Sequence, residues 1–154
     1  MSDARAAAFA ERLAGLGVVI EPREMDESTH TAKQAADAIG CSVAAIVKSL
    51  VLVADGEPLL VLASGPNRVD LDRVGQHVGA PVAMADADTV KRATGSSIGG
   101  VPPLGHPAPL RTIMDESLLD QPVVWAAAAS ARSVFGIEPH RLAELTAAEV
   151  ARVS

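Results

Sequence analysis

Residues 46–64 read IVKSLVLVADGEPLLVLAS, in which an Asp-Gly pair joins two apolar runs. An Asp-Gly pair in this setting is a strong local signal for a tight turn, so the stretch predicts a β-hairpin. Side chains alternate between the two faces of a strand, which places Lys48 on one face with Ile46, Leu50 and Leu52. The opposite face of this strand carries only Val and Ser. The first strand is therefore expected to be apolar on both faces, with one ammonium group that needs an explanation.

The rest of the chain alternates short helical and short extended patterns. Helices are predicted at 3–14, 31–40, 69–79 and 86–95, with a last one starting near Pro139. Strands are predicted at 18–25, 81–85, 110–115, 123–129 and 133–138, and no regular structure at 96–109. Thr31 with Gln34, and Thr146 with Glu149, have the spacing of capping boxes. Hairpins mixed with short helices predict an α+β (mixed α/β) fold, with a twisted and mostly antiparallel sheet in one compact domain over residues 1–154.

The composition limits the classes of partner. The formal net charge is −6 and aromatic residues make up 2% of the chain, which argues against a base-stacking nucleic-acid binder. Cys41 is the one cysteine, so no internal disulfide is expected and a reducing cytoplasm is the simpler location. The N-terminal stretch lacks the apolar core of a signal peptide, and no apolar run is long enough to span a bilayer. A cytoplasmic protein without a membrane partner is expected.

Lys48 has two interpretations. A lysine on a sheet edge can lay its stem on apolar neighbours and keep its charged end in water, and this is the commoner case. Alternatively, Lys48 points into a cleft beside the sheet and meets an anion or a polar carbonyl group. Partial burial there would lower its pKa.

The second candidate for chemistry is IGGVPPLGH, residues 98–106. Glycines let a backbone approach a ligand closely, and prolines stiffen the loop that they stand in. The loop is neither a phosphate-binding Walker loop nor a dinucleotide fingerprint, and a plain connector is the alternative interpretation. His30, His77, His106 and His140 show no metal-ligand spacing, so no metal and no cofactor are expected. His106 closes the loop and has the best claim of the four on a site, whereas Ser64 lacks the surroundings of a hydrolase nucleophile.

Four segments together are similar to the YbaK / prolyl-tRNA-synthetase-associated domain family of aminoacyl-tRNA editing domains. They are THTAKQAADAIGCSVAAIVKSLVL, LLVLASGPNRVDLDRVGQHVG, AMADADTVKRATGSSIGGVPPLGH and MDESLL, in that order. The resemblance covers roughly residues 15–146 and joins the lysine-bearing strand to the glycine-proline loop at the family's separation. It implies a compact domain around a twisted sheet. It also implies hydrolysis of the ester that links a wrong amino acid to the tRNA 3′ end.

The resemblance also implies roles for individual residues. Lys48 corresponds to the family's functional lysine, and Gly99 and Gly100 open its G-x-x-x-P loop, which closes around the aminoacyl group. Pro102, Pro103 and His106 complete that loop, while Thr31 and Ser64 match positions near the same pocket. The chain departs from the common pattern at Pro102, where many members have Ser, at His106, which only part of the family has, and at 126–132, where a glycine-rich turn is common.

The resulting hypothesis is an aminoacyl-tRNA deacylase that acts in trans on a mischarged small amino acid, with tRNA-Pro as the expected carrier. Its expected partners are the aminoacylated tRNA 3′ end and a prolyl-tRNA synthetase or elongation factor that holds the tRNA. Lys33, Arg68, Lys91 and Arg92 are candidates for phosphate contacts, although solvated surface charges are the default. The alternatives are a non-catalytic module that binds tRNA or a synthetase, and a small-molecule-binding protein. Ala, Cys, Ser and Thr all stay open as the amino acid.

Overall fold

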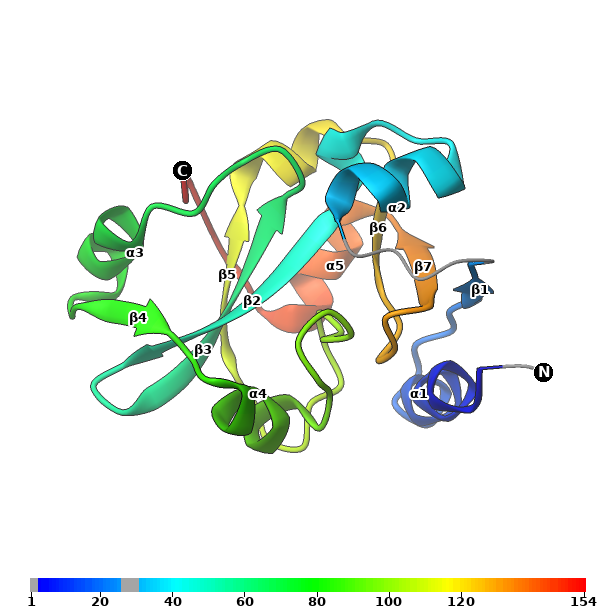
Figure 1. Ribbon diagram of the computed structural model, residues 1–154, viewed down its shortest axis with the longest axis horizontal. Coiled ribbons are helices and arrows are strands. Elements are labelled where there is room, and N and C mark those ends of the chain that lie inside the picture. The colour runs from blue at the N-terminus through cyan, green and yellow to red at the C-terminus, as the bar shows by residue number, and fades with distance from the viewer. Residues whose placement is uncertain (1–2, 26–30) are drawn as a thin grey trace.

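The predicted hairpin is the centre of the fold in the computed structural model, which describes residues 3–25 and 31–154 (Figure 1). Strands β2 (Val47–Ala54) and β3 (Glu57–Ser64) pair antiparallel along their whole length. Asp55 and Gly56 make the turn with φ of 51° and 78°. Positive φ at both central residues is what a two-residue hairpin turn of the favoured kind requires. The hairpin prediction is confirmed.

The described strands form two sheets. The larger has five strands in the order β4-β2-β3-β5-β8, with β4 (Val82–Met84), β5 (Arg111–Asp115) and β8 (Glu149–Ala151) added to the hairpin. The smaller has the order β1-β7-β6, formed by β1 (Arg23–Glu24), β7 (Ser133–Ile137) and β6 (Val124–Ala127). Pairing is antiparallel except at β3–β5 and β5–β8. The predicted α+β fold with a mostly antiparallel sheet is therefore confirmed.

The helices are short, and their ends follow the predicted signals. They are α1 (Ala4–Gly15), α2 (Ala32–Ile39), α3 (Leu71–Val78), α4 (Ala87–Thr94) and α5 (Pro139–Thr146), with 3-10 turns η1 (Val43–Ala45) and η2 (Glu116–Asp120). The capping box at the start of α2 is present: Gln34 N–H donates to Thr31 Oγ1 and Thr31 N–H donates to Gln34 Oε1, both at 3.1 Å. Asp86 caps α4 by accepting a hydrogen bond from Thr89 N–H at 2.8 Å.

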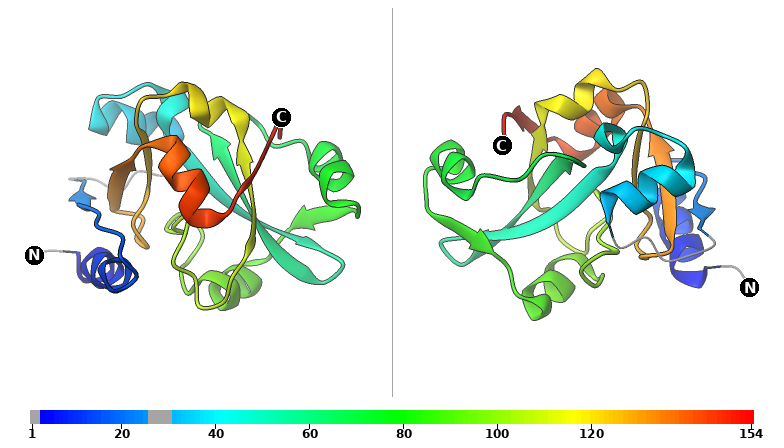
Figure 2. Two further views of the ribbon diagram at one scale, coloured as in Figure 1. Left: turned by 180° about the vertical axis from the view of Figure 1, so that it is seen from behind. Right: turned by 45° about the horizontal axis from the view of Figure 1, so that its top comes forward.

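Two apolar clusters cover the two faces of the larger sheet. Val47 and Val51 belong to the larger cluster, which includes residues of α1, β6, β7 and α5. The view from behind shows α5 lying across this face (Figure 2). The opposite face of β2 contributes Leu52 to a second cluster, which α3 closes through Val74. Lys48 has the same parity as Leu52, so it points towards the second face.

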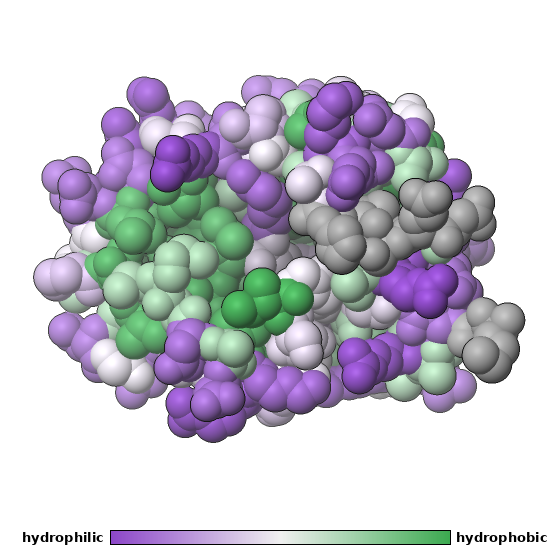
Figure 3. Space-filling view, viewed as in Figure 1, coloured by the Kyte–Doolittle hydropathy of each residue, from purple (hydrophilic) through white to green (hydrophobic). Residues whose placement is uncertain are grey.

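The rim of the second cluster reaches solvent. Figure 3 shows a wide apolar area over α3, β4 and the adjoining part of the hairpin, bordered by polar residues. Met84 in β4 is 55% exposed, and Val69, Leu71, Val78 and Val82 are half-buried around the same cluster. No helix in the described ranges 3–25 and 31–154 is long and apolar enough to cross a membrane.

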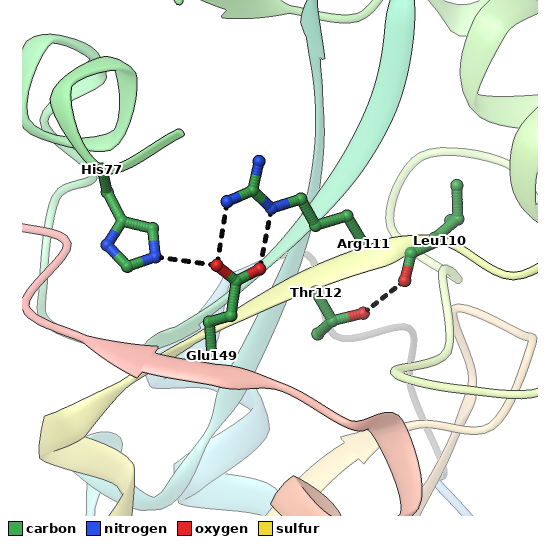
Figure 4. A network of polar contacts seen from close by, with 5 residues as sticks. All are labelled: His77, Leu110, Arg111, Thr112 and Glu149. Carbon is green, nitrogen blue, oxygen red and sulfur yellow. Dashed lines mark hydrogen bonds and ion pairs between the residues drawn. The ribbon is translucent and has the colours of Figure 1, made fainter. Parts of the chain in front are cut away.

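The second predicted capping box, Thr146 with Glu149, is wrong. Thr146 ends α5, and its hydroxyl donates to Leu142 O at 2.8 Å. Glu149 instead lies in β8, which pairs in parallel with β5. Its carboxylate accepts two hydrogen bonds from Arg111, at 2.7 and 2.8 Å, and approaches His77 Nε2 at 3.2 Å (Figure 4). The bidentate Arg111 guanidinium is the main reason that the pKa of Glu149 falls to about 2.

Ser49 carries the one side-chain oxygen or nitrogen in the described residues that is buried without a hydrogen-bond partner. Its hydroxyl lies on the same side of β2 as Val47 and Val51, facing the larger apolar cluster. Burying an unpaired hydroxyl group costs about 1–3 kcal/mol.

We therefore expect Ser49→Ala to stabilise the fold, by about 1 kcal/mol in denaturant unfolding, with the slope of the transition unchanged. Ser133→Ala is the matched control, because the Ser133 hydroxyl is buried but donates to Asp3 Oδ2 at 2.7 Å, so its loss should destabilise. A Ser49→Ala protein that is less stable than wild type would show that this hydroxyl has a partner, such as an internal water.

Candidate functional site

Lys48 stands near the start of β2, an interior strand of the larger sheet. Its ammonium group donates a hydrogen bond of 2.6 Å to the backbone carbonyl of Asn67, in the loop that follows β3. The side chain is half-buried, and this burial lowers its pKa below the ordinary lysine value, while the negative charge of Asp115 acts in the opposite sense. Lys48 is thus a partly desolvated cation held by a backbone carbonyl, which differs from the solvated edge lysine of the commoner interpretation.

A buried carboxylate supports this arrangement. Asp115, at the end of β5, is 1% exposed and accepts hydrogen bonds from three groups. Ser64 N–H donates at 3.0 Å and the Asn67 side-chain amide at 2.9 Å, both to Oδ2, while Ser117 N–H donates at 3.0 Å to Oδ1. Asp115 therefore fixes the end of β3 and the Asn67 loop, and through that loop it fixes the carbonyl group that holds Lys48.

The turn after β3 is pressed against the start of α2. Ser64 Oγ donates to Ala44 O at 2.7 Å. A Cβ atom on Gly65 would lie 2.2 Å from Val43 O and 3.1 Å from Ala32 Cβ, so only glycine fits this position. Ala32 is the first residue of α2 and follows Thr31. Thr31, Ser64 and Lys48 are therefore brought to one end of the hairpin.

The hydroxyl groups of Thr31 and Ser64 both have structural tasks in this arrangement. Thr31 Oγ1 accepts the capping hydrogen bond from Gln34 N–H, and the Ser64 hydroxyl donates to the 3-10 turn η1. Each of these oxygen atoms can still accept a further hydrogen bond. That either contacts a substrate remains a prediction.

The glycine-proline loop is built for a close fit. Gly99 has a φ of 94°, in the left-handed region that favours glycine, with open space where a Cβ atom would stand. Gly100 has no such φ, but a Cβ atom on it would lie 3.1 Å from Ala131 N and from the carbonyl carbon of Ser130. The Gly100 N–H donates to Ser97 O at 2.9 Å. The N–H of Gly100 is therefore already used inside the loop, which leaves Gly99 as the candidate backbone donor to a substrate.

His106 ties the loop together. His106 Nε2 lies 2.8 Å from Pro102 O, and its own carbonyl accepts a hydrogen bond of 2.8 Å from Arg12 in α1. Because a carbonyl oxygen only accepts, Nε2 must carry the proton. Burial lowers the pKa of His106, which favours the neutral ring, although the bond to Pro102 opposes this shift. Pro102 and Pro103 are both buried, so the loop is stiff as well as close-packed.

The loop and the Lys48 region meet through the core. Val101 and Leu104, inside the loop, are buried in the same apolar cluster as Val47, the neighbour of Lys48. The loop therefore packs against the same apolar cluster as Val47 of β2. That Lys48 and Gly99 line one pocket remains a prediction.

The basic residues named as candidates for phosphate contacts have different surroundings. Lys33 forms an exposed pair with Asp37 at 3.2 Å. Lys91 and Arg92 make local bonds near the end of α4, to Gly95 O at 3.3 Å and Thr89 Oγ1 at 3.2 Å. Arg68 is exposed and directly follows Asn67. Arg68 is therefore the candidate nearest in sequence to the Lys48 network.

Sequence reasoning missed Asn67 and Asp115 as parts of the site. Both lie within quoted motifs, in GPNR and MDESLL, where an amide or carboxylate stands directly beside an apolar strand. A polar residue at a strand end was the available signal. Within the described part of the chain, no group of three or more His, Cys, Asp or Glu side chains is placed to hold a metal ion; His30 lies outside the described residues.

The sequence profile of the aminoacyl-tRNA editing domain matches residues 26–145. The chain belongs to this family. The match includes the whole Lys48 network and the glycine-proline loop, and it confirms the resemblance that the motifs indicated.

Individual relatives agree with the family. Protein YwhH of Bacillus subtilis (strain 168), described as uncharacterized, is 32% identical over 128 residues, which are 82% of each chain. A proline–tRNA ligase of Citrifermentans bemidjiense is 36% identical over 103 residues, which are 64% of this chain but only 18% of the ligase. The editing-domain chain thus corresponds to a small part of such ligases.

Solved structures extend the likeness to the whole chain. One is described as a candidate trans-editing enzyme for prolyl tRNA synthetase. It superposes with a TM-score of 0.95 at 41% identity and covers 100% of this chain and 99% of that one. The crystal structure of hypothetical protein APE2540 gives a TM-score of 0.85 at 30% identity, covering 93% and 96% of the two chains.

Proposed function

We propose that this editing-domain protein is an aminoacyl-tRNA deacylase that hydrolyses the ester of a small mischarged amino acid on tRNA-Pro, acting in trans. The observation that carries the proposal is the partly buried Lys48, held by Asn67 and backed by the buried Asp115. Because partial burial of an ammonium group is unfavourable, such a cation in a family of editing domains is a candidate for contact with substrate.

The reaction requires no nucleophilic side chain. Water adds to the ester carbonyl carbon, the carbonyl oxygen becomes an oxyanion, and the C–O bond to the ribose breaks. The ribose oxygen then takes up a proton, so that the products are a free amino acid and an uncharged tRNA. The vicinal ribose hydroxyl of the substrate can assist the proton transfer.

Two groups of this chain suit the substrate and the oxyanion that forms on it. The Lys48 ammonium group would hold the terminal phosphate or ribose, or polarise the ester. The Gly99 N–H would donate to the oxyanion as it forms, which is an effective use of a rigid backbone donor. Asp115 would act through Asn67 by keeping Lys48 in place, so it is a positioning residue.

A deacylation screen tests the proposal directly. The purified protein is incubated with tRNA-Pro charged with Ala, Cys, Ser, Thr or Pro, and release of the amino acid is followed over time. We expect hydrolysis of at least one small non-cognate ester and sparing of prolyl-tRNA. Binding of charged tRNA without any hydrolysis in the panel would favour the non-catalytic module instead, and failure to bind any tRNA would favour a small-molecule-binding protein.

His106 provides a test of specificity. Pocket walls discriminate by volume and by unpaired polar groups, and one methylene in an apolar pocket contributes only about 1–3 kcal/mol. A histidine that faces the pocket would favour Ser and Thr, whose hydroxyls it could meet. Since its Nε2 is bound to Pro102 O, we expect His106→Ala to lower activity towards the whole panel through a looser loop, with the preference order kept.

The measurement is kcat/KM for Ala-, Cys-, Ser- and Thr-charged tRNA, for wild type and His106→Ala. A selective loss for Ser and Thr would place the imidazole in the specificity wall. His140→Ala is the control, because His140 is an exposed histidine paired with Glu138 in the last helix.

A further inference from the structure

A cavity of about 270 Å³ lies between α1 and the glycine-proline loop. Arg5, Phe9 and Arg12 of α1 line one side of it, and Gly95, Pro102 and Gly105 line the other. The α1 residues recur at the three- and four-residue spacing of one helical face. The cavity therefore adjoins the loop that the proposed chemistry uses, but its helical wall precedes residues 26–145, which the domain profile matches.

The charged side chains that line the cavity are all positive. Arg5 and Arg12 are both exposed residues at the cavity, and the described residues that line it include no acidic side chain. Arg12 uses one N–H group to hold His106 O, which leaves the rest of its donors for a ligand. Lys91 donates to the carbonyl of Gly95, a lining residue, at 3.3 Å, so a third cation lies close to the lining. The guanidinium group of Arg5 and the remaining donors of Arg12 suit a phosphate, because guanidinium groups can bind phosphate bidentately.

The remainder of the lining is apolar or backbone. Phe9 and Pro102 are buried and form part of the walls, with small residues around them. A volume of about 270 Å³ lies just below the usual range of ligand pockets, which begins at about 300 Å³. It suits one phosphate with part of its sugar rather than a large cofactor. On a chain whose formal net charge is −6, this is a local basic feature of the kind that RNA contact would need.

We propose that this cavity binds a backbone phosphate of the tRNA near its 3′ end, with Arg5 and Arg12 as the contacting residues. The proposal rests on the proposed deacylase function. A domain that acts in trans is not joined to a synthetase that binds the tRNA. A phosphate-binding site beside the glycine-proline loop would therefore add affinity for the tRNA. The candidate trans-editing protein whose structure covers 100% of this chain shares this helix in its fold.

Binding of uncharged tRNA-Pro tests the proposal without any hydrolysis. Fluorescence anisotropy gives Kd at several salt concentrations for wild type, Arg5→Ala and Arg141→Ala. Arg141 is the control, since it is an exposed arginine on α5, on the rear face of the larger sheet (Figure 2). For Arg5→Ala we expect Kd to rise roughly 3- to 10-fold and the slope of log Kd against log salt to fall by about 0.7–0.9, the effect of losing one phosphate contact.

Arg12→Ala should show the same change in slope, with a further effect on the loop because Arg12 also holds His106 O. Arg5→Ala is therefore the cleaner variant. With charged tRNA, Arg5→Ala should raise KM and leave kcat near the wild-type value, because the contact is made equally in the ground state and the transition state.

The possible results distinguish the phosphate site from the deacylase activity. A Kd and salt slope for Arg5→Ala equal to those of Arg141→Ala would overturn the phosphate site, even if the deacylation screen succeeds. Loss of inorganic phosphate or AMP binding in Arg5→Ala, with tRNA binding as in the control, would identify a small-anion site and also overturn it. An Arg5-dependent salt slope in a protein that hydrolyses none of the charged tRNAs would keep the phosphate site and overturn the deacylase.

Discussion

Replacement of Lys48 by methionine should reduce deacylation by roughly 10²-fold or more while the protein stays folded. That is the scale of losing one preorganised contact to charge that develops in the transition state. Methionine keeps most of the volume of the aliphatic stem, so no cavity is created on the second face of the sheet. The three hydrogen bonds that Asp115 accepts from Ser64, Asn67 and Ser117 do not involve Lys48, so we expect the variant to keep them.

The direction in which Lys48→Met changes the stability follows from the pKa of Lys48. Burial lowers the folded-state pKa of Lys48 below its unfolded value, so at neutral pH the charged form is less favourable in the folded state than in the unfolded chain. This cost is fully present below the folded pKa and disappears as pH rises towards the unfolded value. Lys48→Met removes the charge, so we expect a melting temperature at pH 7 that is unchanged or slightly higher.

The measurements are kcat/KM on the preferred charged tRNA and thermal unfolding at pH 7, with Arg141→Met as the control for loss of one exposed charge. If the ammonium form is the active one, wild-type activity should also fall at alkaline pH, below the ordinary lysine pKa of about 10.4. A Lys48→Met protein with the wild-type rate would remove Lys48 from the reaction, and an unfolded variant would make it a structural lysine.

The parts of the fold that were predictable have local causes. The Asp-Gly turn set the register of the hairpin, and the caps at Thr31 and Asp86 set the starts of α2 and α4 within a few residues. Each signal lies within four residues of the feature that it determines. The fold class followed, because a central hairpin with short helices allows few other arrangements.

The parts that were missed depend on contacts between distant segments. The spacing of Thr146 and Glu149 predicts a capping box, but a bidentate pair with Arg111 and parallel pairing to β5 place Glu149 in a strand. A short strand that completes a parallel pair carries little pattern of its own. The same is true of Asp115, whose partners Ser64 and Asn67 are 51 and 48 residues away.

The glycine-proline loop has features that local sequence predicts and features that depend on distant segments. Its irregular shape was accessible from composition, since Gly and Pro exclude regular structure, whereas the packing of Val101 and Leu104 into the core was not. The task of each glycine was not: Gly99 has the left-handed φ, while Gly100 is held by its close approach to Ser130 and Ala131. A sequence does not show which distant backbone segment a glycine touches.

Gly100→Val is the second substitution with a large expected effect. The added side chain would push against the backbone of the segment at Ser130 and Ala131, which cannot give way as the end of a flexible side chain would. Overpacking of this kind costs about 1–3 kcal/mol, or a fall in melting temperature of about 2–12 °C for a chain of this size. The strain would fall on the loop, so Gly99 N–H would lose its position relative to Lys48.

We therefore expect Gly100→Val to lower kcat/KM by roughly 10²-fold or more, measured well below its own melting temperature so that the protein assayed is folded. Gly56→Ala is the matched control for stability: Gly56 has a φ of 78° in the β2–β3 turn, with open space around it, so alanine there is strained without touching another segment. This control should lose stability and keep its activity per folded molecule. If Gly100→Val behaves like Gly56→Ala, the loop does not take part in the reaction, and Lys48 and Gly99 do not share a pocket. A loss confined to Gly100→Val would tie the chemistry to the position of the loop, because the two variants differ in where the strain falls.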